Sequence, residues 1–306
     1  MDNITSINTH LVVIIDLYPS VHLLKEDQDY EKWLNSIISF CMSHFLLNNL
    51  NKLHIIVSNF ASNEIIYPLS KEADYGKLAN NGQHYLFNQA SQIIFKRIRE
   101  SVTRSKEIAA ELNHHSGQVN DYPLISGALA IGLCCIQRCK SQVDSSRIAI
   151  FTANNDSSSS FSSQFMNFMN VFFTAQKMNV VIDTCILSSE IEDSRLTMSI
   201  FQQGCDLTNG LYLKLSNLNA FLEYLIWTLL PDTDTRKKLV LPTQKKISYK
   251  AACFCHRNLI DIGYVCSICL SIFCTFSPIC STCHTVFKLG PLPPGIKIKR
   301  KTAKVK

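Results

Sequence analysis

The sequence predicts an α/β domain with a doubly wound, mostly parallel sheet, followed by a small C-terminal zinc-binding module. Over roughly the first 230 residues, short β-branched runs alternate with longer segments of helical periodicity. Such alternation places helices on both faces of a parallel sheet. Seven of the 13 cysteines then fall between Cys253 and Cys283, in a segment too short to build a hydrophobic core of its own.

The predicted strands are short apolar runs. His10–Asp16 is a continuous β-branched run that ends in Asp, which is typical of a strand buried on both faces. Residues 63–68 follow the second run closely enough to be its hairpin partner or a short edge strand. The other strands are expected at residues 54–60, 147–153, 180–186 and 210–215.

The predicted helices lie between these strands. Residues 30–49 carry apolar side chains at helical spacing. Residues 161–177 carry apolar side chains around most of the helix circumference, so we expect this helix to be buried on more than one side. Residues 124–139 are rich in Ala and Gly, which favours close packing. Further helices are expected at residues 89–112, 194–204 and 218–230, and a serine-rich turn is expected at 156–160, whereas residues 70–88 receive no assignment.

Length and composition indicate one domain of about 230 residues plus an appendage. An apolar content of 46% with 18% charged residues is typical of a globular chain. No apolar run approaches the roughly 18 to 20 residues that span a bilayer, so we expect no membrane segment. The expected parts are the α/β domain at 8–231, a linker at 232–250, the zinc module at 251–288 and a basic tail at 289–306.

Two C-x-x-C pairs, Cys266 with Cys269 and Cys280 with Cys283, are separated by ten residues. Each pair is typical of a tight turn that presents two sulfurs, and two such turns complete a tetrahedral zinc site. We therefore predict one zinc ion bound by these four cysteines.

Four further candidate ligands, Cys253, Cys255, His256 and Cys274, alternate with the first set along the chain. This alternation predicts a cross-braced, RING-like module with a second zinc ion. In the alternative interpretation, Cys255 and Cys274 are small buried apolar residues and the module holds one zinc ion.

Two other chemistries compete for the same cysteines. A disulfide framework needs an oxidising compartment, but Met1–Ser6 has no basic segment ahead of an apolar run, so we expect a reducing one. Cys280–His284 matches the C-x-x-C-H of haem attachment, with His284 as an extra candidate ligand. The paired spacing favours zinc. The remaining cysteines are expected to be packing residues: Cys41, Cys134, Cys135, Cys139, Cys185 and Cys205.

The positive charge is concentrated at the C-terminal end. Residues 289–306 carry six Lys or Arg and no acid, which equals the formal net charge of +6 of the whole chain. The rest is close to neutral, so we expect any direct DNA contact to be minor. The tail is interpreted as a nuclear localisation signal, a phosphate-binding arm or a solubilising end.

Enzyme motifs are missing from the sequence. It contains no G-x-x-x-x-G-K-[ST], no G-x-G-x-x-G after the first strand and no G-x-S-x-G. A nucleotide-binding or hydrolase site is therefore not supported, and we expect no catalytic activity.

The strand ending in Asp16, followed by alternating α/β units, resembles a von Willebrand factor A domain, whose fold is Rossmann-like. That family holds a divalent cation with a D-x-S-x-S loop and later Thr and Asp ligands. Asp16 and Ser20 match this loop, Tyr18 replaces the middle Ser, and Asp156 is the candidate for the later acid. Because hard cations need several fixed oxygen ligands, we expect this degenerate site to hold no Mg²⁺.

The whole chain, from about residue 8 to the tail, resembles the family of the smaller A-domain subunit of TFIIH, the general transcription and DNA-repair factor. The resemblance is carried by residues 164–173, 210–214 and, most densely, 251–283. It implies a non-catalytic, nuclear subunit of the TFIIH core that acts in RNA polymerase II initiation and nucleotide excision repair. It also implies binding to the larger A-domain subunit and a place beside the helicases. A RING-type ubiquitin ligase and a cation-dependent adhesion domain are the alternatives.

Overall fold

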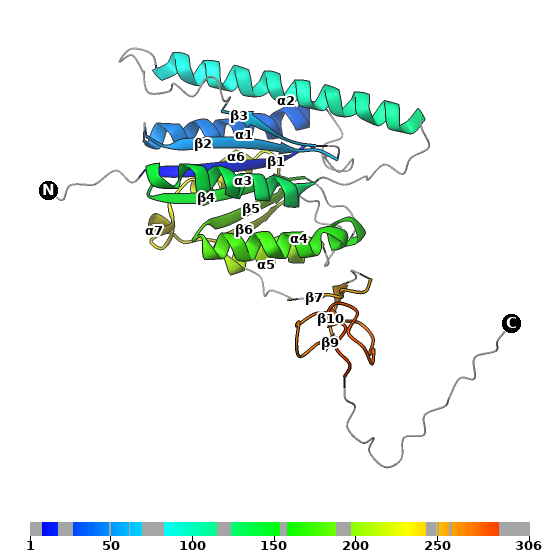
Figure 1. The fold of residues 1–306 in the computed structure, drawn as a ribbon. Helices are drawn as coiled ribbons and strands as arrows, with labels where there is room; N and C mark the ends of the chain where they lie inside the picture. The colour runs from blue at the N-terminus through cyan, green and yellow to red at the C-terminus, as the bar shows by residue number, and fades with distance from the viewer. Residues whose placement is uncertain are drawn as a thin grey trace. The chain divides into compact units, whose positions relative to one another are not determined.

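The computed structural model divides the chain into two compact units, Met1–Tyr249 and Lys250–Lys306, drawn in Figure 1. Each unit is described by itself. The structure describes residues 8–17, 27–48, 50–60, 62–68, 83–114, 124–153, 158–187, 197–242, 249, 251–256 and 259–287.

The first unit is built on a six-stranded sheet with the order β3-β2-β1-β4-β5-β6. Central β1 (Thr9–Asp16) pairs in parallel with both β2 (Lys52–Ser58) and β4 (Ser145–Thr152). The parallel order continues through β5 (Val181–Leu187) and β6 (Tyr212–Leu215). The predicted mostly parallel sheet is thus confirmed.

The edge strand β3 (Asn63–Tyr67) runs antiparallel to β2, with Ile56 opposite Ile65. Residues 63–68 were predicted to be a hairpin partner or an edge strand, and the structure makes them both.

Helices cover both faces of the sheet (Figure 1). One face is covered by α1 (Asp27–Leu47), α2 (Gln83–His114) and α6 (Phe221–Tyr224). Helix α1 contacts both α2 and α6. On the other face lie α3 (Ile125–Cys139), α4 (Ser158–Lys177) and α5 (Thr197–Leu207). A sheet between two helical layers is the doubly wound arrangement that the alternating pattern predicts.

Alternate residues of each strand serve the two layers. Leu11, Val13 and Ile15 are buried in the cluster that includes Trp33 and Phe40 of α1. Val12 faces α3 instead, since a Cβ atom added to Gly132 of α3 would lie 3.2 Å from Val12 Cγ1. The Gly- and Ala-rich helix therefore packs closely against the sheet, as its composition predicts.

Several helix boundaries differ from the prediction. Helices α1, α4 and α5 are shifted or extended by two or three residues, so that residues 158–160 of the predicted serine-rich turn are helical. Two other differences are larger. Helix α2 begins at Gln83, so part of the polar segment at 70–88 is helical. The helix predicted at 218–230 is instead the short α6 followed by a π-helical turn, Leu225–Leu229. Periodicity locates these helices, but it does not resolve where their hydrogen bonding starts or changes register.

The predicted linker at 232–250 starts too early. Residues 233–236 form a short helix, α7 (Thr233–Arg236), which Asp232 caps by accepting a hydrogen bond from the backbone N–H of Thr235. Arg236 is only 5% exposed and is bound to Asp183 of β5. The first unit therefore extends beyond residue 231, because a buried ion pair joins this segment to the sheet.

The second unit contains two small antiparallel ladders. One pairs β7 (Ala251–Ala252) with β8 (Leu259–Ile260), and the other pairs β9 (Tyr264–Val265) with β10 (Ile272–Phe273). Its buried cluster consists of Cys266, Phe273 and Cys280, with other cysteines and Phe287 packed around them. Cysteine side chains thus occupy the place of a hydrophobic core.

No helix within the described ranges is long and apolar enough to cross a membrane.

Candidate metal centre

The first predicted ligand set comes together in the second unit. The sulfurs of Cys266, Cys269, Cys280 and Cys283 all lie within 4.8 Å of one another. The Sγ atoms of Cys266 and Cys283 are 3.7 Å apart, and those of Cys269 and Cys280 are 3.5 Å apart. A tetrahedron with zinc–sulfur bonds of about 2.3 Å has edges of about 3.8 Å, whereas a disulfide bond measures about 2.05 Å. The spacing suits a shared metal ion.

Two equivalent turns build this set. The backbone N–H of Leu270 donates to Cys266 O at 3.0 Å, and that of His284 donates to Cys280 O at 2.9 Å. Leu270 and His284 have φ angles of 59° and 58°, in the left-handed region that closes such a turn. Each C-x-x-C pair is thereby folded locally so that both sulfurs face one point.

Neighbouring hydroxyl groups stabilise the thiolates of the two turns. The Ser271 hydroxyl lies 3.2 Å from Cys269 Sγ, and the Thr285 hydroxyl lies 3.1 Å from Cys283 Sγ. The hydrogen bond between Cys269 and Ser271 lowers the pKa of Cys269 to about 6, and the one between Cys283 and Thr285 lowers the pKa of Cys283. The thiolate is the form that binds a metal ion, so this environment favours coordination.

His284 belongs to none of the candidate ligand groups that the described residues form. It is exposed and occupies the left-handed position that ends the second turn. The C-x-x-C-H match therefore comes from the turn, and His284, named above as an extra candidate ligand, lies outside both sets.

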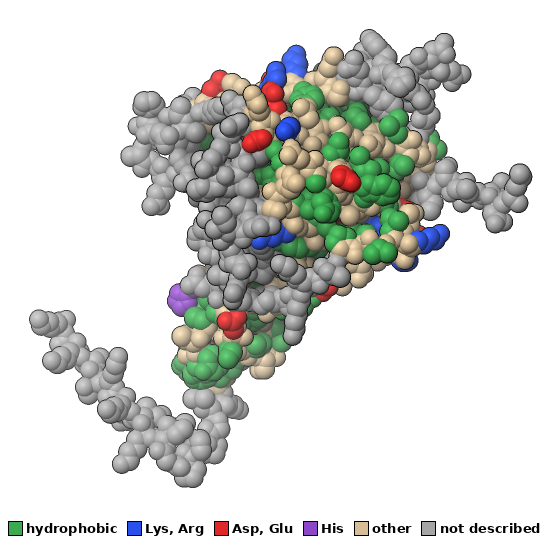
Figure 2. All heavy atoms as spheres, turned by 180° about the vertical axis from the view of Figure 1, so that it is seen from behind, with side chains coloured by type: hydrophobic (Ala, Val, Ile, Leu, Met, Phe, Trp, Pro, Cys, Tyr) green, Lys and Arg blue, Asp and Glu red, His purple; other side chains and the backbone are tan. Residues whose placement is uncertain are grey.

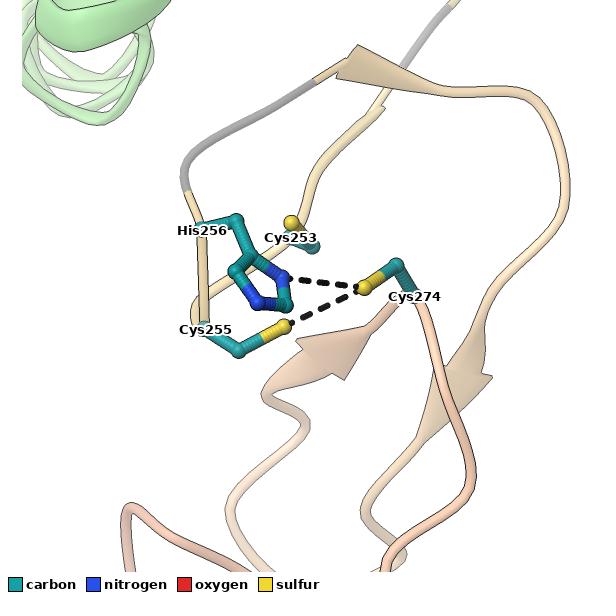
Figure 3. A group of neighbouring side chains, drawn as sticks. All are labelled: Cys253, Cys255, His256 and Cys274. Atoms are coloured by element: carbon teal, nitrogen blue, oxygen red, sulfur yellow. Dashed lines mark hydrogen bonds between the residues drawn. The ribbon is translucent and has the colours of Figure 1, made fainter.

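The second predicted set also comes together (Figure 3). Cys274 Sγ lies 3.4 Å from Cys255 Sγ and 3.2 Å from His256 Nδ1, and Cys253 completes the group. Cys253 is buried, whereas Cys255 and His256 are exposed on the turn after β7. Cys274 follows β10, and the backbone N–H of Phe254 donates to Ile272 O at 2.8 Å, which joins the two segments.

The two sets interleave along the chain. Cys253, Cys255 and His256 come first, the pair at 266 and 269 follows, Cys274 returns to the first group, and the last pair closes the second. This is a cross-braced order, because ligands of each group lie between ligands of the other group in the sequence. Sulfur and imidazole nitrogen are the ligands that structural zinc sites use. The cysteine clusters can therefore hold metal ions.

The degenerate cation site is described only in part. Asp16 is buried and its Oδ2 accepts a hydrogen bond of 2.7 Å from the hydroxyl of Thr152 at the end of β4. Ser20 and Asp156 lie outside the described residues, as does Tyr18. Asp16 thus joins the carboxyl ends of two adjacent strands.

Sequence reasoning missed a buried charged group in the first unit. Arg236 binds both carboxylate oxygens of Asp183, at 2.9 and 2.6 Å, and Asp183 also accepts from the N–H of Leu211 at 2.8 Å. Arg147 donates to carbonyl oxygens of residues 229–231 at 2.6 to 2.8 Å. Burial, together with the charge of Arg236, lowers the pKa of Arg147 to about 10. Charged residues inside otherwise buried strands were the available signal.

The sheet order and the interleaved ligand groups define the class: a von Willebrand A-like domain followed by a small module with two cross-braced groups of candidate metal ligands. The family model described as "Transcription factor Tfb4" matches residues 8–284, and the chain belongs to this family.

Relatives in other organisms support this assignment. "General transcription factor IIH subunit 3" of Dictyostelium discoideum is 34% identical over 85% of this chain and 68% of its own length. "General transcription and DNA repair factor IIH subunit tfb4" of Schizosaccharomyces pombe is 32% identical over 92% of this chain and 90% of its own length. The crystal structure of the TFIIH p34 N-terminal domain has the same fold, with a TM-score of 0.53, 20% identity and coverage of 72% of this chain and 98% of that one.

Proposed function

We propose that the chain is a non-catalytic structural subunit of the TFIIH core, acting in RNA polymerase II transcription initiation and nucleotide excision repair. The observation that carries the proposal is the family match over residues 8–284, which spans both units. Relatives that align along nearly their whole length are named as subunits of this factor.

The metal centre is proposed to hold two structural zinc ions. Each group supplies four protein ligands, which fills a tetrahedral shell and leaves no position for a substrate or a catalytic water. The chemistry of the donor set, seven thiols and one imidazole, fits zinc in a reducing compartment. The ions would fix the shape of the second unit.

Asp16 is proposed to serve structure and not cation binding. Its hydrogen bond with Thr152 occupies a carboxylate oxygen that an adhesive A domain would offer to Mg²⁺. The adhesion alternative therefore has little support from the described part of this site.

The proposed partners are the larger A-domain subunit and the helicases of TFIIH, in the nucleus. The second unit exposes several apolar side chains (Figure 2), including Ile262, Ile268, Leu270 and Val286, each more than 60% exposed. Exposed apolar surface of this kind is typical of a protein interface. The RING-type ubiquitin ligase alternative finds no support among the relatives, which are named as transcription factor subunits.

Co-purification tests this assignment. The tagged full chain, isolated from its own cells and washed at high salt, is expected to retain the other TFIIH core subunits, including both helicases. A Cys134→Ser chain should retain them equally, because Cys134 is an exposed thiol on α3 that belongs to no ligand group. Recovery of the wild-type chain as a lone monomer would contradict the proposal.

A further inference from the structure

A third cluster of candidate metal-ligating side chains lies within the first unit. It contains His10 of β1, His54 of β2 and Cys139, the last residue of α3. In β1, residue 10 alternates in phase with Val12, which contacts Gly132 of α3, so His10 faces α3. His54 precedes Ile56, which also contacts Gly132, and therefore shares this face.

The three ligand atoms are close enough to share one ion. They all lie within 4.8 Å of one another, and His10 Nε2 is 2.8 Å from His54 Nδ1. Two nitrogens on a tetrahedral zinc, with bonds of about 2.0 Å, are about 3.3 Å apart. The two rings would therefore have to separate by about half an ångström, which is a side-chain adjustment.

We propose that His10, His54 and Cys139 form a metal site for a thiophilic divalent cation such as Zn²⁺, with one coordination position open to solvent. His10 is fully buried, whereas His54 and Cys139 are partly exposed, so an ion can enter from their side. The site joins two adjacent strands to the end of a helix and goes beyond the proposed function.

The protonation changes on binding are small. In the metal-free pair, one N–H lies between the two facing ring nitrogens. Binding moves that proton to the other nitrogen of the same ring, so that both facing nitrogens offer lone pairs. The Cys139 thiol loses its proton to solvent. Burial is the main cause that lowers the pKa of His10 to about 3 and of His54 to about 4, so both rings are neutral near pH 7.

Positive charges near the cluster lower its affinity for a cation. Lys52 acts on both histidines, and Arg138 acts on His54. They oppose a bare divalent ion, and the Cys139 thiolate and a solvent anion at the open position would offset this repulsion. The third site is therefore expected to bind more weakly than the two four-ligand groups of the second unit.

Co²⁺ is the probe, because it replaces zinc in such sites and its bond to a thiolate absorbs in the near ultraviolet. Untagged full chain, with zinc retained in the second unit, is titrated with Co²⁺ under reducing conditions. One Co²⁺ per chain should bind without zinc release and produce the thiolate absorption band. Cys139→Ser should abolish this band, and His54→Gln should weaken binding at least about tenfold. Cys134→Ser, on the same helix but outside the cluster, should behave as wild type.

Two results would overturn the proposal. One is a wild-type chain that binds no Co²⁺ beyond its retained zinc. The other is a thiolate band that persists in the Cys139→Ser chain, since the cobalt would then sit elsewhere. Thermal unfolding without Co²⁺ and zinc content establish that each variant is folded. If neither Cys139→Ser nor His54→Gln is folded, the titration of the wild-type chain tests the site, because a wild-type chain that binds no Co²⁺ has no third metal site.

Discussion

Replacing Cys280 with serine is expected to release one zinc ion and unfold the part of the second unit that this ion holds. Cys280 is fully buried, and the buried cluster of this unit is made largely of ligand cysteines. Structural zinc supplies on the order of 10 kcal/mol or more of folding free energy in small domains. Apart from the ligand cysteines, the buried cluster among the described residues contains only Phe273, with Phe287 packed against it. Metal analysis should find about one zinc ion fewer per chain, and limited proteolysis should cleave the second unit much faster.

His284→Asn is the matched control. His284 stands four residues after Cys280, is exposed and has a φ angle of 58°, a conformation that Asn tolerates. This chain should keep wild-type zinc content and protease resistance. If His284→Asn loses zinc while Cys280→Ser keeps it, the ligand assignment is wrong.

Replacing Arg236 with alanine is expected to lower the free energy of unfolding of the first unit by about 3–5 kcal/mol. The variant leaves the Asp183 carboxylate, whose side chain is only 2% exposed, without its bidentate partner. It also removes one of the two arginine donors to Leu229 O, and with it the contact between α7 and the end of the π-helical turn, while Arg147 still donates to this oxygen. Removing one partner of a buried ion pair destabilises a protein more than replacing both partners with apolar residues, because the remaining charge stays buried without a partner.

Tryptophan fluorescence can follow this unfolding selectively. The chain has two Trp residues, Trp33 and Trp227, and both lie in the first unit. Trp33 is fully buried against the sheet, so its emission should change when the core opens. Denaturant titration of the variant against wild type then gives the difference in unfolding free energy.

The neighbouring residue supplies the control for Arg236. Lys237 also pairs with an acid, Asp234, at 2.8 Å, but both side chains are at least 70% exposed. Lys237→Ala should leave the denaturation midpoint of the first unit nearly unchanged, because exposed ion pairs contribute little to stability. Equal effects of the two substitutions would contradict a structural role for the buried pair.

Most of the sheet could be predicted because each buried strand is a local apolar run. The edge strand β3 followed from its closeness to β2 in sequence. Helix α7 could not be predicted, since four polar residues after a proline are typical of a linker. Helix α7 is held in place by the ion pair between Arg236 and Asp183, which lies 53 residues earlier in the sequence.

The candidate metal centre was predictable to the extent that its geometry is local. The C-x-x-C pairs fold within five residues, so their spacing alone predicts that their sulfurs converge. Cys274 could be grouped with Cys253 only through the alternation of the two sets. The cluster of His10, His54 and Cys139 has no local spacing. Its members meet because parallel strand pairing and the packing of α3 bring them together.

Zinc stoichiometry tests most directly whether eight side chains of the second unit hold two ions. The full chain would be purified without added metal and passed over a weak chelating resin, which removes loosely bound ions. Elemental analysis is expected to give two zinc ions per chain. A value of one would mean that Cys253, Cys255, His256 and Cys274 hold no ion, and a value of zero would contradict a metal-folded module altogether.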